Sequence, residues 1–225
     1  MLRIFLSLFL LAAAAAAQAQ TPPSSADLAG YEGLHLAAHE GDATAIRRIA
    51  AAGADLNARD RAGRTPAHVA AFASNDAALR ALAEAGADMN ALESRAYDVL
   101  TIAAVADDPE MVSLALELGN DPGLITSIYD GTALIAAAHL GHHQVVRRLI
   151  AGGAPLDHVN NLGWTALMEA VVLGDGGPDH VATVQALIEA GADTGIADFD
   201  GVTPLQHAKA RGFAEIAKII GASRQ

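Results

Sequence analysis

Cysteine is absent from the 225 residues of this chain, and aromatic residues make up only 4% of them. Without cysteine the chain has no disulfide, no thiolate ligand for zinc and no cysteine nucleophile. Basic residues are also few, with 14 Lys and Arg against 26 Asp and Glu, and the net charge is −12. A chain this acidic repels nucleic-acid phosphates, so we predict no nucleic-acid partner.

Sequence motifs of common enzyme classes are missing as well. The chain has no G-x-S-x-G, no phosphate-binding P-loop and no G-x-G-x-x-G. His39-Glu40 begins like a zinc-protease motif, but Ala43 stands where the second histidine is needed. We therefore predict a protein that is not an enzyme and has neither a cofactor nor a bound metal.

The first 19 residues predict a secretory signal peptide (1–19). Arg3 supplies a positive charge, and the apolar run that follows is 14 residues long, short of the roughly 20 needed to span a bilayer. Ala17-Gln18-Ala19 fits the small-x-small cleavage pattern. We expect a mature chain that begins at Gln20, is periplasmic or secreted, and has no membrane contact after cleavage.

A pattern with a period of 33 residues organises the rest of the chain. Thr132-Ala133-Leu134 opens a short apolar helix, Gly141 ends it, and a second helix follows. The pattern begins again at Thr165-Ala166-Leu167. Threonine can cap a helix N-terminus, and a proline after it, as in Thr65-Pro66, fits the first helical position.

These residues resemble the ankyrin repeat, in which T-P-L-H opens a helix pair and G-A-D closes it. The copy from Thr65-Pro66-Ala67-His68 to Gly86-Ala87-Asp88 is close to that pattern, and Gly53-Ala54-Asp55 and Gly191-Ala192-Asp193 end two others. The resemblance implies an all-α solenoid of about six helix-turn-helix repeats with β-turn fingers. With its leader and its acidic, cysteine-free composition, the chain is similar to bacterial periplasmic ankyrin-repeat proteins in particular.

The expected domain organisation follows from these patterns. Residues 20–29 contain two adjacent prolines and predict a flexible lead-in with no packing face. An insertion within residues 173–180 of the fifth repeat is expected to project from the stack. The ankyrin domain is expected at 30–225, with repeats at about 30–59, 60–92, 93–126, 127–159, 160–197 and 198–225.

Two groups of residues have side chains of the kind that bind metal ions. His139, His142 and His143 lie around one turn, with His158 later in the same repeat, and imidazoles four residues apart can share a metal. The resemblance implies instead a histidine that hydrogen-bonds to backbone after Gly141, and we favour that interpretation. The run from Asp198 to Gly201 is similar to half a calcium loop but lacks the downstream glutamate, so we expect a finger there.

Aligned by register, the repeats place their largest side chains in two columns, which the resemblance implies line the concave face. Tyr, Trp and Arg are the residue types enriched at interface hot spots. We therefore predict an aromatic-rimmed, partly apolar groove that binds a protein or peptide. The alternative, that these side chains pack on adjacent repeats, stays open. The columns comprise Tyr31, Arg64, Tyr97 and Trp164 before the helix caps, and His39, Phe72, Val105, His139, Leu140 and Val172 at the helix ends.

The predicted function is a non-catalytic protein-protein interaction scaffold that acts as a monomer in the periplasm or outside the cell. The resemblance also implies a link to stress protection. The alternative is an inhibitor or immunity protein whose acidic surface masks a basic exported enzyme. Binding to an acidic surface would weaken steeply with salt, whereas binding in an apolar groove would not. The partner's identity stays open.

Overall fold

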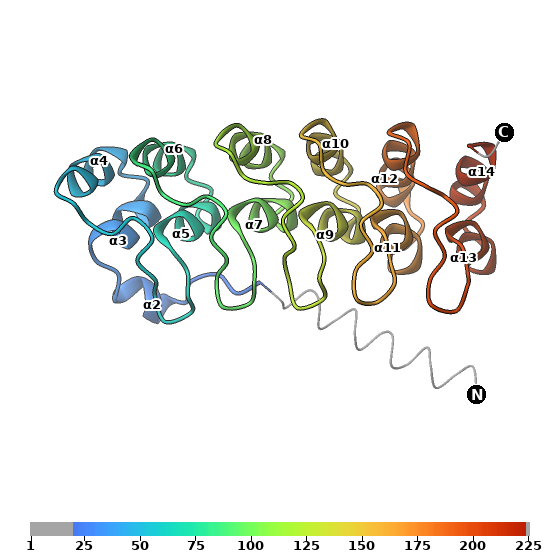
Figure 1. Ribbon diagram of the computed structural model, residues 1–225, viewed down its shortest axis with the longest axis horizontal. Coiled ribbons are helices and arrows are strands. Elements are labelled where there is room, and N and C mark those ends of the chain that lie inside the picture. Colours follow the sequence, from blue (N-terminus) through green and yellow to red (C-terminus); the bar gives the residue numbers. More distant parts are fainter. Residues whose placement is uncertain (1–19, 224–225) are drawn as a thin grey trace.

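The computed structural model describes residues 20–223, and these residues form a row of six stacked helix pairs (Figure 1). Residues 20–223 contain no β-strand, and the backbone bridge between Thr126 and Gly131 is isolated. The predicted all-α solenoid is therefore confirmed. The pairs are α3 (Gly33–Glu40) with α4 (Ala43–Ala51), α5 (Pro66–Phe72) with α6 (Asp76–Ala85), α7 (Val99–Val105) with α8 (Pro109–Glu117), α9 (Ala133–Leu140) with α10 (His143–Ala151), α11 (Ala166–Val172) with α12 (Pro178–Glu189), and α13 (Pro204–Ala210) with α14 (Ala214–Ala222).

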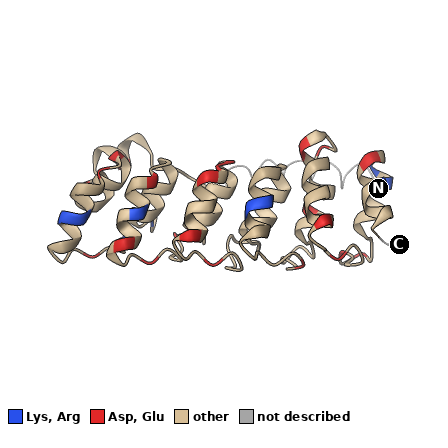
Figure 2. Cartoon of the chain, turned by 90° about the horizontal axis from the view of Figure 1, so that it is seen from above, with Lys and Arg blue, Asp and Glu red and all other residues tan. Residues whose placement is uncertain are grey.

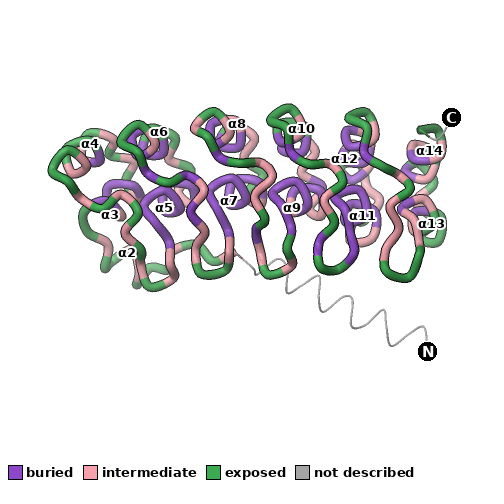
Figure 3. Tube along the Cα trace, viewed as in Figure 1, coloured by how far each residue is buried: buried purple, intermediate pink, exposed green. Residues whose placement is uncertain are grey.

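The helices form two layers, and hairpin-like fingers extend from the inner one (Figure 1). The inner layer contains α3, α5, α7, α9, α11 and α13, and the outer layer contains the second helix of each pair. One hydrophobic core runs between the layers along the whole row, which is why buried residues follow the inner helices in every repeat (Figure 3). No helix pair encloses its own apolar face, so each depends on its neighbours.

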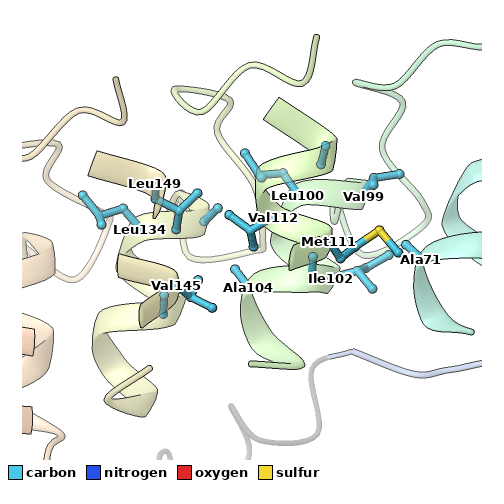
Figure 4. Packing of buried hydrophobic residues seen from close by; sticks show 14 of the residues in the cluster. Ala71, Val99, Leu100, Ile102, Ala104, Met111, Val112, Leu134, Val145 and Leu149 are labelled. Carbon is cyan, nitrogen blue, oxygen red and sulfur yellow. The ribbon is translucent and has the colours of Figure 1, made fainter. Parts of the chain in front are cut away.

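Large and small apolar residues share this core. Leu100, Met111, Leu134 and Leu149 are fully buried. Met111 lies toward Ala71 of the preceding repeat, and Leu149 lies on the opposite side, beside Leu134 (Figure 4). Alanines such as Ala104 let the helices approach closely, because a methyl group occupies little space between two backbones.

The helix boundaries follow from the cap residues that the sequence predicts. Asp98 accepts a hydrogen bond from the backbone N–H of Thr101 at 2.8 Å, and Thr165 accepts one from Met168 at 3.2 Å. These bonds satisfy donors that the first turn of a helix leaves free. Gly141 ends α9 with a φ of 75°, a left-handed conformation that glycine adopts without strain.

The fingers are held by an acidic or amide side chain at their base. In the second finger, Oδ1 of Asp60 accepts hydrogen bonds from the backbone N–H groups of Ala62 and Arg64 at 2.8 and 2.9 Å. Asp198 makes the same pair of bonds in the sixth finger, to Asp200 and Val202. The calcium-like run from Asp198 to Gly201 is thus a finger, and its first carboxylate is already used to shape the turn.

The lead-in differs from its prediction. Residues 20–29, which we call the strap, include a helix, α2 (Ser25–Ala29), and the strap lies against the first three repeats (Figure 1). Ser24 caps α2 by accepting from the N–H of Asp27 at 3.2 Å. The prediction of a segment without a packing face is wrong, because the strap contacts the repeats through Gln20, Thr21 and Asp27. The sequence pattern gives no sign of these contacts.

The insertion in the fifth repeat also differs from its prediction. It does not project: Gly174 is buried, and the Phe213 ring lies against Gly176. The added residues lengthen the outer helix α12 at its N-terminus, and His180 of α12 hydrogen-bonds with the carbonyl of His139 at 3.0 Å.

Two predictions concern the chain's N-terminus and membranes. The predicted signal peptide, residues 1–19, lies outside the described residues. Within residues 20–223, no helix is both long enough and apolar enough to cross a membrane.

Candidate functional site

The column before the helix caps is largely buried. Arg64, Tyr97 and Trp164 have exposed fractions of 2%, 6% and 8%, and only Tyr31 is partly exposed. Tyr97 belongs to the hydrophobic core, Arg64 pairs with Asp60 and Asp27, and Tyr31 bonds to Asp60 of the next repeat. They leave little surface for a partner, so the predicted aromatic rim is not formed by Tyr97 and Trp164.

Arg64 is the centre of a buried ionic network. Its Nε lies 2.7 Å from Asp60 Oδ2, and its Nη2 lies 3.0 Å from Asp27 Oδ2. The Tyr31 hydroxyl donates to the same Asp60 oxygen at 2.7 Å. Burial opposes ionisation of Asp60, but the hydrogen bonds from Tyr31 and Arg64 outweigh it and hold the pKa of Asp60 below its usual range.

The first two members of the helix-end column lie beside the strap and are half-buried. His39 and Phe72 line a small pocket whose other wall is the strap, where Pro22 and Pro23 lie. The concave face over the first repeats is therefore occupied by the chain's own N-terminal segment.

The later members of that column are partly exposed. Val105, Leu140 and Val172 end the inner helices α7, α9 and α11 and remain partly accessible. His139 Nδ1 lies 3.2 Å from Oε2 of Glu169, a carboxylate whose side chain is 5% exposed. The other Glu169 oxygen accepts a hydrogen bond from Asn160 at 2.8 Å. The two columns therefore do not form one continuous groove.

The histidine cluster bonds to backbone and to separate acids. His142 Nδ1 donates to the carbonyl of Ala104 at 2.9 Å, which confirms the predicted backbone bond. His143 lies 3.5 Å from Asp179, and His158 bonds to the carbonyl of Asp130. In the part of the chain that the structure describes, no three His, Asp or Glu side chains gather as they would around a metal ion.

An exposed apolar surface that the sequence analysis missed lies on the fingers of repeats four to six. We call it the finger row. Its most exposed members are Ile128 at 69% and Phe199 at 80%, values that are unusual for large apolar side chains in a protein this well packed. The members are Ile125, Ile128, Val159, Leu162 and Phe199.

The finger row is held in place by bonds between adjacent fingers. Asn161 in the fifth finger bonds to the carbonyls of Tyr129 and Ile128, both at 3.0 Å. The Phe199 ring of the sixth finger lies against Gly163 of the fifth, where a Cβ atom would approach the ring to 3.0 Å. The fingers that carry the row are thus fixed relative to one another by these contacts.

Charge is distributed unevenly around the finger row. Between Arg95 and Lys209 the only basic residues are Arg147 and Arg148, and both lie on the outer helix α10 (Figure 2). The fingers of repeats four to six therefore carry acids, such as Asp130 and Asp200, and no Lys or Arg. An alignment of finger tips would have revealed the row, because arginines stand at Arg61 and Arg95 in the earlier fingers.

The helix pairs, fingers and continuous core define a repeat solenoid with an exposed apolar surface on its fingers. A family model for ankyrin repeats in three copies matches residues 7–93 and 100–198. This match covers well over half of the chain, and the chain belongs to the ankyrin-repeat family.

Similar proteins include bacterial ankyrin domains. An ankyrin repeat domain from Acinetobacter baumannii AYE is 42% identical, with a TM-score of 0.79 over 85% of this chain and 97% of that one. The ankyrin repeat protein YahD of Escherichia coli K12 is 42% identical over 93 residues, 41% of this chain, and the matched part spans only 46% of YahD.

A more distant structure shares the fold alone. It contains the predatory endopeptidase Bd0816 from Bdellovibrio bacteriovorus in complex with the immunity protein Bd3460. The match is 24% identical, with a TM-score of 0.69, and covers 85% of this chain and 98% of that one.

Proposed function

We propose that this protein is a non-catalytic binding protein that holds a protein partner on the finger row. The observation that carries the proposal is the row itself, a run of exposed apolar side chains over three adjacent fingers. Contiguous apolar surface on a soluble protein marks a site of interaction. Apolar side chains that leave water at the centre of an interface favour association.

The surroundings of the row define the partner's chemistry. Acidic side chains flank it, and the fingers that carry it contain no Lys or Arg. A fitting partner therefore presents an apolar patch with Lys or Arg at its edges. Opposite charges at the rim of an interface raise the association rate, while the apolar centre slows dissociation.

Export from the cytoplasm is part of the proposal. The leader-like residues 1–19 support a periplasmic or secreted location, as does the lack of cysteine. A stress-protection role in that compartment is a further part, supported only by resemblance to periplasmic ankyrin proteins. Fractionation of cells that express the tagged chain tests the location. Survival of a deletion strain under oxidant tests the role.

The experiment for the binding surface compares two triple variants in affinity capture from an extract of the compartment. Ile128→Asp, Leu162→Asp and Phe199→Asp place three charges on the row. Thr44→Asp, Ala77→Asp and Gln144→Asp place three charges on exposed positions of the outer helices and serve as the control. We expect one partner to be lost with the first variant and retained with the second. Loss with both or with neither would refute the finger row as the binding surface.

The second candidate is an inhibitor or immunity protein that covers a basic enzyme. The net charge of −12 and the uneven distribution of arginine favour it, and an ankyrin-like fold occurs in a solved complex of an endopeptidase with an immunity protein. This candidate predicts capture that survives the row variant but is lost at high salt.

A further inference from the structure

The strap crosses the first three repeats on the side of the inner helices and the fingers (Figure 1). At one end the side-chain amide of Gln20 donates to the carbonyl of Thr101 in α7 at 3.0 Å. At the other end, the strap forms α2 beside the second finger, where Asp27 meets Arg64. Residues 20–24 thus run in the direction in which the repeats stack, as an extended ligand of this face would, and residues 25–29 form α2.

The apolar part of this contact is made by the half-buried Pro23 and Leu28, with the exposed Pro22 at its edge. Proline has no backbone N–H to leave unsatisfied, and its fixed φ favours an extended chain with little entropy to lose. The strap residues Pro22, Pro23 and Leu28 face His39, Val69, Phe72 and Ala73 of the first two repeats across a pocket of about 90 Å³.

The polar part of the contact is made by one buried cation. Arg64 Nη1 donates to the carbonyl of Thr21 at 3.2 Å, and Arg64 Nη2 donates to Asp27 Oδ2 at 3.0 Å. The Arg64 side chain is 2% exposed, so the strap both covers this guanidinium and supplies two of its acceptors. Ser24 N–H and Arg64 hold the pKa of Asp27 at about 2, well below its usual range, and its carboxylate is ionised at neutral pH.

The strap is held by few contacts, and the pocket beneath the prolines is not filled. Ser25 and Ala26 are exposed, and the bonds from strap to repeats involve Gln20, Thr21 and Asp27. A chain covalently joined to its site needs little intrinsic affinity, since the linkage supplies an effective concentration of about millimolar. A tighter segment from another molecule could therefore replace it.

We propose that the face over repeats one to three is a binding site for an extended, proline-containing segment with a carboxylate opposite Arg64, and that the strap is its intramolecular occupant. A protein with an exposed segment of this chemistry binds here by displacing the strap. This site shares no residue with the finger row. A variant that disrupts binding at one surface therefore leaves the other surface intact.

The first test measures binding of a fluorescent peptide with the sequence of residues 20–30 to the purified protein. Pro23→Asp with Leu28→Asp places charges at the two half-buried strap residues that line the pocket and releases the strap. Ser25→Asp with Ala26→Asp adds the same charge on the exposed side of α2 and is the matched control. We expect the peptide to bind the released variant at least about tenfold more tightly than the wild type or the control. A peptide with Asp27→Lys should bind none of them.

The second test measures how fast a protease cuts the strap in the same three proteins. Cleavage should be slow in the wild type and in the control, and fast in the released variant, while circular dichroism of the repeats stays unchanged. Equal cleavage rates in all three would show that the strap is not held. Equal peptide affinity in all three, or binding to none, would show that this face is not a site for such a segment. Either result overturns the proposal.

Discussion

Arg64 shows how one side chain can look like a contact residue in the sequence and be structural in the fold. It stands in the column that the ankyrin resemblance places on the concave face, yet its guanidinium is buried and bonded to Asp60, Asp27 and a strap carbonyl. A buried cation with several partners is costly to disturb, because the remaining carboxylates keep their charges without compensation.

Replacing Arg64 with leucine should therefore destabilise the protein by about 3–5 kcal/mol, since Asp60 is left ionised and largely buried. Denaturant unfolding measures the change. The control is Arg47→Leu, which removes an arginine whose pair with Glu84 is more than half exposed on both sides, and should cost less than about 1 kcal/mol. Similar losses for both variants would show that the Arg64 network has no special role in stability.

His68 is a second buried polar residue with a consequence for pH. Its Nδ1 accepts from the Thr65 N–H at 3.1 Å, so its Nε2 carries the proton and donates to the carbonyl of Tyr97 at 3.0 Å. Burial lowers the pKa of His68 to about 4, while an unfolded histidine titrates near 6.5. The folded state binds fewer protons between these values, so stability is full above 6.5 and falls as the pH drops toward 4.

His68→Gln should remove this pH dependence. Glutamine makes the same capping contact at Gln206 in the sixth repeat, so α5 should still form. We expect the wild type to lose about 2 kcal/mol more than the variant between about pH 7 and about pH 5, measured by denaturant unfolding at both. At neutral pH the variant should be less stable by about 1 kcal/mol, because the bond to Tyr97 is lost. Parallel pH profiles would contradict the assignment.

Local rules predicted much at this scale. The cap at Thr165 and the helix end at Gly141 occur as expected, because they depend on residues within one turn. Whether Tyr97 or Trp164 faces a partner depends on the neighbouring repeat, which packs against the finger base. A single repeat's sequence does not contain that information.

At the scale of elements, the inner helices are tied to the next repeat through their C-terminal carbonyls. Asn75 donates to the carbonyls of Ala38 and His39. His142 donates to the carbonyl of Ala104, and Arg211 donates to the carbonyls of Val171 and Val172. Carbonyls in the last turn of a helix lack the usual N–H partner one turn further on, so each of these bonds caps one repeat with a side chain of the following one. His180 provides this contact in the fifth repeat, at the carbonyl of His139.

His180→Ala should therefore loosen the contact between repeats four and five and cost about 1–3 kcal/mol, because it leaves a carbonyl unpaired and empties the space beside Gly141. The matched control is His143→Ala, at a histidine that is more exposed and farther from its acidic neighbour. It should change stability by less than about 0.5 kcal/mol. Thermal unfolding followed by circular dichroism compares them, and equal melting temperatures would rule out this role for His180.

The two elements that the sequence analysis described incorrectly, the strap and the insertion, are both stabilised by distant residues. The strap has prolines and serines, which are typical of links, and its position depends on Arg64 and Phe72. The insertion packs because Phe213 from the next repeat lies over Gly176. Amino-acid composition indicates which local backbone conformation a segment prefers. These contacts instead join residues that are 35 or more positions apart in the sequence. The finger row was missed for a similar reason, since its members become neighbours only when the fingers stack.

At the scale of the whole molecule, the stack predicts where stability is lost when a core side chain is shortened. Each repeat contacts only its neighbours, so a central repeat supports two others and a terminal repeat supports one. Leu134 of α9 and Ile216 of α14 are both completely buried. Shortening either to alanine removes similar apolar volume and should cost about 2–5 kcal/mol locally, but the effect should spread differently.

Hydrogen exchange followed by mass spectrometry distinguishes these effects. In the wild type, amide protection should be highest in the central repeats and lowest in repeat six, which has only one neighbour. Leu134→Ala should lower protection on both sides, in α7 and α11 as well as α9, because both interfaces lose a partner. Ile216→Ala should increase exchange in α13 and α14 and leave α9 unchanged. A uniform loss of protection from Ile216→Ala would instead mean that the six repeats unfold as one indivisible unit, with no separate response at the C-terminal end.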